Sequence, residues 1–160
     1  MKKINHFING KEYISKSDRF GDIFNPASGE KIGSVSFANK DDVALAIQKA
    51  SDAQKKWAAT PPLARSRVMF KFKELILRDM DKLALELTNE HGKILSDSVG
   101  SLTRGMEVVE FACGIPHLLK GEFSENVGTE IDSWSTRQPL GVCVGISPFN
   151  FPAMVPMWMF

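Results

Sequence analysis

Residues 141–160, GVCVGISPFNFPAMVPMWMF, contain the pattern that decides the fold class. Val142 to Ile146 is a consecutive β-rich run, which predicts a strand that is covered on both faces. Turn-forming residues from Ser147 to Pro152 follow directly, and the apolar run after them predicts a helix that is buried all round in a larger core. A buried strand that passes through a tight turn into a helix favours an α/β fold, in which ligands lie at the carboxyl ends of strands.

The first forty residues predict short antiparallel strands. Asn9-Gly10 between strand-like flanks is a strong hairpin signal, because both residue types tolerate a positive φ. A second pair of strands is expected over residues 19–24 and 30–37. The turn cluster Asn-Pro-Ala-Ser-Gly at residues 25–29 lies between them.

Apolar residues then recur at three- and four-residue steps, which predicts four helices. Asp41 and Asp42 favour a helix start, Pro62 suits a first turn that does not need its missing N–H, and Gly92 is a stop signal. The expected helices run from about 41 to 59, from 62 to beyond 76, from about 81 to 91, and from 96 or 97 towards 114, where Pro116 fits the end.

Residues 121–139 form a different pattern, in which Phe123, Val127, Ile131 and Trp134 are separated by small and polar residues. This spacing predicts two modest strands with a turn. The free edges of an exposed hairpin are a natural surface for pairing with another subunit.

Composition excludes several classes of protein. The chain has 160 residues, 43% of them hydrophobic, and a formal net charge of +1, with charges of both signs interspersed. We therefore expect no nucleic-acid arm, no membrane span and no signal peptide. Two cysteines without metal-ligand spacing predict neither a disulfide scaffold nor a metal site, so a reduced, cytoplasmic protein is the expectation, or a mitochondrial matrix protein in a eukaryote.

Most chemistry-bearing side chains have a structural interpretation. Cys143 in its β-rich run and Cys113 on a helix are expected to be buried core residues rather than nucleophiles. The three histidines are scattered and are expected at the surface or at helix ends: His6, His91 and His117.

Arg104 and Asn150 remain as candidates. Arg104 on a helix is most often a solvated or salt-bridged residue, although its planar guanidinium suits a carboxylate ligand. Asn150, in a turn just past a strand, is either a plain turn residue or an amide donor that can stabilise an oxyanion.

Four ordered motifs resemble those of the aldehyde dehydrogenase superfamily. Pro139 to Val142 with Ile146 to Pro152 is similar to its PxGV…xPWNFP signature, and Asn25 to Glu30 resembles its N-P-A-T-G-E turn. Trp57 followed by Pro61 to Arg65 resembles its W…P…R segment, and Glu90 to Lys93 its E-x-G-K helix end. Together the motifs cover essentially the whole chain.

Within the superfamily, the sequence is most similar to the coenzyme A-acylating methylmalonate-semialdehyde dehydrogenases. Phe149 stands where tryptophan is usual, and residues 104–113 and 150–160 carry the same likeness. The resemblance implies that a cysteine attacks the aldehyde and that hydride then passes to NAD, which leaves a thioester on the cysteine. Coenzyme A rather than water would then attack this thioester. Methylmalonate or malonate semialdehyde would give propionyl-CoA or acetyl-CoA after loss of carbon dioxide.

The resemblance also implies roles for single residues. Asn150 would be the catalytic side-chain donor of the oxyanion hole, and Ser147 and Phe149 would line the nicotinamide end of the NAD site. Arg104 would bind the substrate carboxylate. The segment 121–140 would be the oligomerisation hairpin of a dimer or tetramer.

Members of this family are considerably longer, so the resemblance implies an N-terminal fragment. Residues 1–120 would belong to the coenzyme-binding domain, and residues 141–160 would supply its first core strand and the start of the following helix. The nucleophilic cysteine would lie beyond Phe160, which leaves this chain inactive alone and prone to associate. Two alternatives stay open: a general NAD(P)-dependent aldehyde dehydrogenase, and an inactive fragment that acts only in assembly.

Overall fold

Short strands occupy the N-terminal part of the chain, in a computed structural model that describes residues 2–160. β2 (His6–Ile8) and β3 (Lys11–Tyr13) form an antiparallel hairpin. Its turn is Asn9-Gly10, with φ values of 55° and 75°. The hairpin prediction is therefore confirmed, in the left-handed conformation that these two residue types adopt most readily.

A three-stranded sheet completes this region. β4 (Phe20–Phe24) and β5 (Lys31–Ser36) pair antiparallel around the predicted 25–29 turn, where the Asn25 side chain accepts a hydrogen bond from the Ala27 N–H. β1 (Lys2–Ile4) adds to the other edge of β5 as a parallel strand, with Lys2 opposite Gly33. The sequence did not predict β1, because a strand of three residues is too short to show a period.

Four long helices follow at the predicted places. Each starts within about two residues of its expected start, which is the usual uncertainty of a helix boundary. They are α1 (Lys40–Ala59), α2 (Pro62–Arg78), α3 (Met80–His91) and α4 (Leu95–Cys113), and the short α5 (Ile115–Leu118) contains Pro116.

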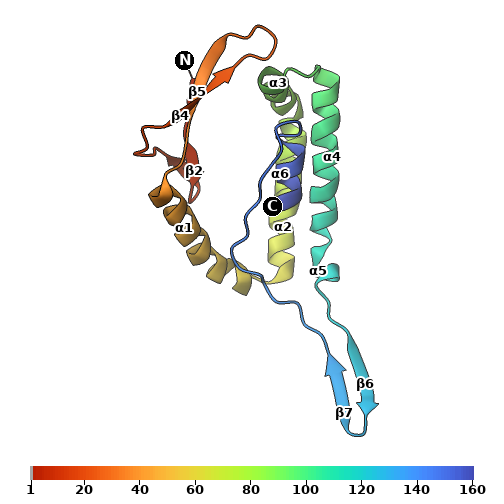
Figure 1. Cartoon of the computed structure of the whole chain (residues 1–160). Helices are drawn as coiled ribbons and strands as arrows, with labels where there is room; N and C mark the ends of the chain where they lie inside the picture. The colour runs from red at the N-terminus through yellow and green to blue at the C-terminus, as the bar shows by residue number, and fades with distance from the viewer. Residues whose placement is uncertain (1) are drawn as a thin grey trace.

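The core lies among α2, α3, α4 and the C-terminal helix α6 (Met154–Met159), which Figure 1 shows side by side. Cys113 is buried here, and desolvation raises the pKa of its thiol. The hydroxyl of Ser66 donates to the Cys113 carbonyl at 2.7 Å, which ties α2 to the end of α4. The structural interpretation of Cys113 is confirmed. The fully or nearly buried apolar residues of this cluster are Ile76, Ala84, Leu87, Leu102, Val109 and Met157.

A hairpin projects from the rest of the molecule (Figure 1). It consists of β6 (Phe123–Gly128) and β7 (Ile131–Trp134), paired antiparallel as predicted. The apolar side chains of this hairpin are exposed: Phe123, Val127, Ile131 and Trp134. No helix of residues 2–160 is long and apolar enough to cross a membrane.

The buried strand predicted over Val142–Ile146 is wrong for this structure. Residues 141–148 run without regular secondary structure, and Val144 is 83% exposed. Cys143 is exposed as well, so its predicted burial is also wrong. A strand covered on both faces needs neighbours on both sides, and residues 2–160 place no strand beside this segment.

Helix α6 is buried on one side only. Met154 and Met157 face the core, whereas Trp158, Met159 and Phe160 are exposed. The expected all-round burial is therefore wrong, because among residues 2–160 the contacts of α6 with other elements are made mainly with α4.

Asp42 fastens the N-terminal hairpin to the start of α1. Its carboxylate accepts hydrogen bonds from the Ser15 hydroxyl at 2.5 Å and from the Asn39 N–H at 2.8 Å, and the Asn39 side chain caps the helix in return. The Ser15 hydroxyl, followed by the Asn39 N–H, lowers the pKa of Asp42. The hydrogen bond between Tyr13 and Asp42 raises the pKa of the Tyr13 phenol.

This junction predicts a specific loss of stability in acid. A carboxyl group whose pKa is lower in the folded state stabilises the fold above its unfolded pKa of about 4, and the stabilisation disappears as the pH falls through the folded pKa. We expect Asp42→Asn to lower the melting temperature at neutral pH and to flatten its fall between roughly pH 5 and pH 3. Circular dichroism melts measure both effects. Asp41→Asn, an exposed neighbour, should keep the acid dependence of the wild type, and an equally steep fall in Asp42→Asn would contradict the role of this junction.

Candidate active site

The turn around Asn150 lies at the end of the bundle where α3 meets α4. Figure 1 shows the loop before α6 at this end of the molecule. The Asn150 carbonyl accepts a hydrogen bond from Lys93 Nζ at 3.2 Å. Lys93 comes directly after Gly92, which ends α3 with a φ of 84°. Two motifs that are 57 residues apart in the sequence, Glu90–Lys93 and the Asn150 turn, therefore meet in the structure.

The side chain of Asn150 is exposed and its amide is available to a ligand. Within residues 2–160, the structure gives this amide no hydrogen-bond partner, although the backbone of the same residue is held by Lys93. A neutral amide with a fixed backbone and a free N–H₂ is suited to donating to an oxygen that gains negative charge.

Close contact between α4 and α6 places Gly105, the neighbour of Arg104, against Met154 and Met157. A Cβ atom added to Gly105 would lie 2.8 Å from Met157 Sδ and 3.1 Å from Met154 Cα, so only glycine permits this approach. Arg104 precedes Gly105 and is exposed, and no ion pair holds its guanidinium within the described residues 2–160. It follows Ser101 by three residues on α4, and Ser101 in turn contacts Lys93.

Ser147 and Phe149 are exposed in the same turn, and the Phe149 ring is 90% exposed. A hydroxyl, an aromatic face and the open backbone groups of a turn are donors, acceptors and a stacking surface for a planar amide ring. Groups of these kinds hold planar polar ligands in proteins. Among residues 2–160, no hydrogen bond or ion pair joins Ser147 or Phe149 to Arg104.

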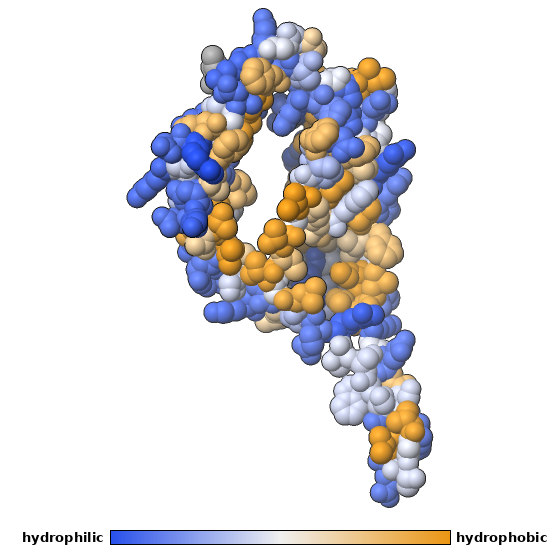
Figure 2. Space-filling model, in the orientation of Figure 1, coloured by the Kyte–Doolittle hydropathy of each residue, from blue (hydrophilic) through white to orange (hydrophobic). Residues whose placement is uncertain are grey.

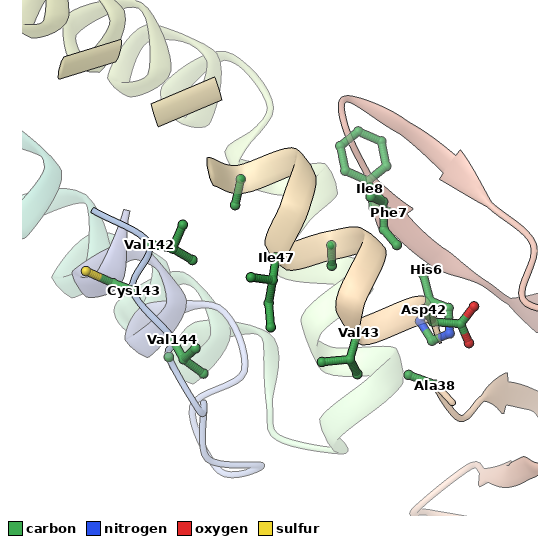
Figure 3. Close-up of a pocket in the computed structure, with 13 residues that line it drawn as sticks. His6, Phe7, Ile8, Ala38, Asp42, Val43, Ile47, Val142, Cys143 and Val144 are labelled. Atoms are coloured by element: carbon green, nitrogen blue, oxygen red, sulfur yellow. The ribbon is translucent and has the colours of Figure 1, made fainter. Parts of the chain in front are cut away.

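An apolar groove of about 500 Å³ lies along the segment before this turn. Val142 and Val144 line one side, and Val43 and Ile47 of α1 line the other (Figure 3). Figure 2 shows hydrophobic side chains around the rim of the opening between α1 and the helical bundle.

Cys143, His6 and Asp42 all line this groove, but they do not form a nucleophile–base pair. Figure 3 shows Cys143 on the side opposite His6 and Asp42, and its thiol donates to the Gly141 carbonyl at 3.8 Å. His6 is half-buried beside the Tyr13 ring rather than at the surface, because the hairpin folds against α1. His91 ends α3 and His117 is exposed, as predicted. The part of the chain described here contains no group of three potential metal ligands.

Lys93 is the residue that sequence reasoning missed. Its motif marks a helix end, which by itself predicts no role for the ammonium group. The motif Glu90–Lys93 was the available signal, since a lysine directly after a left-handed glycine projects from a fixed corner of the backbone.

Comparisons with known proteins identify the family of the chain. The profile of the aldehyde dehydrogenase family matches residues 13–160. The chain is 46% identical over its whole length to a malonate-semialdehyde dehydrogenase of Pseudomonas aeruginosa, of which it covers 32%. It is 47% identical over 99% of its length to an acylating mitochondrial methylmalonate-semialdehyde dehydrogenase of Arabidopsis thaliana, of which it covers 26%.

Solved structures give the same result for the fold. A methylmalonate-semialdehyde dehydrogenase of Oceanimonas doudoroffii superposes with a TM-score of 0.94 and 51% identity, over 99% of this chain and 32% of that one. A protein of Sinorhizobium meliloti described as the same enzyme, complexed with NAD, superposes with a TM-score of 0.96 at 51% identity, over 99% and 32% of the two chains. The chain thus spans about a third of the length of these relatives, in the α/β fold that the sequence predicts. It belongs to the aldehyde dehydrogenase family.

Proposed function

We propose that this chain contributes to the NAD-dependent, coenzyme A-acylating oxidation of methylmalonate or malonate semialdehyde. The observation that carries the proposal is the exposed Asn150 amide, held by its backbone at the corner of α3 and α4, near the turn of α4 that bears Arg104. The names of the relatives from Pseudomonas aeruginosa and Arabidopsis thaliana support the substrate class and, for the second, the acylating reaction.

Each residue has a distinct task in this proposal. The Asn150 amide donates to the aldehyde oxygen and stabilises the negative charge that develops there during nucleophilic attack. The Arg104 guanidinium binds the substrate carboxylate through paired N–H donors. Ser147 and Phe149 hold the nicotinamide end of NAD, which supplies the hydride acceptor.

The overall reaction balances without a further oxidant. The semialdehyde carboxylate, NAD⁺ and coenzyme A give the acyl-CoA, NADH and carbon dioxide. The aldehyde carbon is oxidised, NAD is reduced, and the carbon that loses carbon dioxide gains the proton that the thiol gives up. The nucleophilic cysteine is proposed to come from residues that correspond to the remaining two thirds of the relatives, since Cys113 is buried and Cys143 lies in the apolar groove.

The β6–β7 hairpin is proposed to pair with a second copy of the chain in a homo-oligomer. Its edges are open within residues 2–160, and the apolar side chains Phe123, Ile131 and Trp134 are exposed. Pairing would cover these groups and the free edge of the hairpin.

A second candidate is a general aldehyde dehydrogenase that uses NAD or NADP and releases the free acid. An NADP-dependent enzyme of Escherichia coli superposes with a TM-score of 0.88 at 29% identity, over 96% of this chain and 32% of that one. The same fold therefore serves enzymes that differ in coenzyme.

The acylating proposal is tested by the products. We expect the natural polypeptide that contains these residues to reduce NAD with methylmalonate semialdehyde, and to form propionyl-CoA when coenzyme A is added. Mass spectrometry of the products and the absorbance of NADH measure the two steps. Release of methylmalonate as the free acid, at a rate independent of coenzyme A, would instead identify the second candidate.

A further inference from the structure

Lys93 makes a three-way contact that the proposed reaction does not use. Its ammonium nitrogen lies 3.2 Å from the Asn150 carbonyl oxygen and 3.3 Å from Ser101 Oγ. The same nitrogen lies 4.8 Å from the centre of the Phe151 ring, in the geometry of a cation–π contact. One side chain thus joins α4 to both residues at the tip of the turn.

The backbone from which the Lys93 side chain extends is held in place by several contacts. The Gly92 N–H closes the last turn of α3 on the Thr88 carbonyl at 2.8 Å, and the hydroxyls of Thr88 and Ser98 join α3 to α4 at 2.8 Å. Gly92 itself packs against Pro26, where an added Cβ atom would lie 2.8 Å from the proline ring. Lys93 therefore extends from a corner that has little freedom to move.

The turn that Lys93 reaches has few other attachments. Residues 141–150 are exposed, and within residues 2–160 the Lys93 bond is the only hydrogen bond that joins residues 144–150 to another part of the chain. An ammonium that donates to a carbonyl forms a charge-assisted bond, which is stronger than a neutral one. This contact restrains the peptide plane that follows Asn150, and thereby the backbone from which the Asn150 side chain extends.

We infer that Lys93 is a positioning residue, whose ammonium orients the Asn150 amide towards the aldehyde oxygen by holding the Asn150 carbonyl. This inference rests on the proposed role of Asn150. It assigns Lys93 no contact with substrate or coenzyme. Because a small displacement of a reacting group lowers the rate of an oriented reaction steeply, the loss of this contact should appear in kcat.

The test uses the natural polypeptide that contains these residues. Lys93→Met keeps the apolar stem of the side chain and removes its donors, so kcat for NADH formation should fall about tenfold to a hundredfold with little change in the Kd of NAD. Lys93→Arg still offers donors and should recover a large part of the rate. Lys82→Met, an exposed lysine on α3, is the matched control and should match the wild type.

A double-mutant cycle separates positioning from a merely structural effect. In the Asn150→Ala background, Lys93→Met should lower the rate no further, because its target is already absent. An additive loss, or a failure of Lys93→Arg to recover activity, would overturn the inference. If Asn150→Ala alone kept the wild-type rate, the proposed role of Asn150 would fail, whatever Lys93 does.

Hydrogen exchange supplies a readout that does not depend on turnover. Lys93→Met should speed amide exchange at Val155, whose N–H donates to the Phe151 carbonyl at 3.3 Å, and leave α2 and α4 protected, whereas Lys82→Met should leave both regions unchanged. If Lys93→Met does not fold, Lys93→Arg and Ser101→Ala test the same contact. Unchanged exchange at Val155 in a folded Lys93→Met would overturn the inference.

Discussion

Replacement of Asn150 by alanine is expected to lower the acylation rate of the natural enzyme by about 10²–10³-fold. The amide of Asn150 is exposed and free of partners within residues 2–160, and its carbonyl is held by Lys93 at 3.2 Å. The substitution therefore removes a donor without opening a cavity in the core. Single-turnover formation of NADH measures the step directly, and the Kd of NAD should change little.

Two further variants make the Asn150 experiment specific. Asn150→Asp has nearly the same shape but places a negative charge beside the developing oxyanion, so it should be at least as slow as Asn150→Ala. Asn89→Ala removes an exposed amide from α3 and should leave the rate unchanged. An Asn150→Ala enzyme with nearly the wild-type kcat would remove Asn150 from the mechanism.

Replacement of Arg104 by leucine is expected to change substrate preference more than the overall rate. A hydrogen-bonded charge pair contributes about 1.5–3 kcal/mol, which corresponds to a loss of roughly 10- to 150-fold in kcat/KM for a semialdehyde that carries a carboxylate. Activity on propanal should be nearly unchanged, because propanal has no carboxylate to bind. The guanidinium is exposed, so the substitution leaves the core packing of α4 intact.

The comparison of the two substrates provides the internal control for Arg104. Arg67→Leu changes an exposed arginine on α2 and should leave both activities as in the wild type. Equal losses on methylmalonate semialdehyde and on propanal would show that Arg104 is not the carboxylate ligand.

The local structure could be predicted from residues whose backbone preferences are strong. Asn9-Gly10 predicted the first hairpin, Pro62 predicted the start of α2, and Gly92 predicted the end of α3. In each case the signal is local, because it arises from the allowed φ of one or two residues. The four helices could be predicted for a related reason, since their apolar residues recur with the period of a helix.

The remaining features depend on contacts between distant residues. β1 pairs with β5 across about thirty residues, and three residues show no period. The run Val142–Ile146 has the composition of a buried strand, but composition cannot supply the neighbouring strands that burial requires. Lys93 and Asn150 are 57 residues apart, so their contact follows only from the packing of the turn on the α3–α4 corner.

The central claim is that the turn at residues 147–150 receives the reacting aldehyde, and the most direct measurement is a crystal structure. The natural polypeptide would be crystallised with NAD and an unreactive analogue of methylmalonate semialdehyde. We expect the Asn150 amide nitrogen about 2.7–3.1 Å from the carbonyl oxygen of the analogue, with the Arg104 guanidinium paired to its carboxylate. An Asn150 amide turned away from that oxygen, with the carboxylate bound by other cations, would contradict the claim.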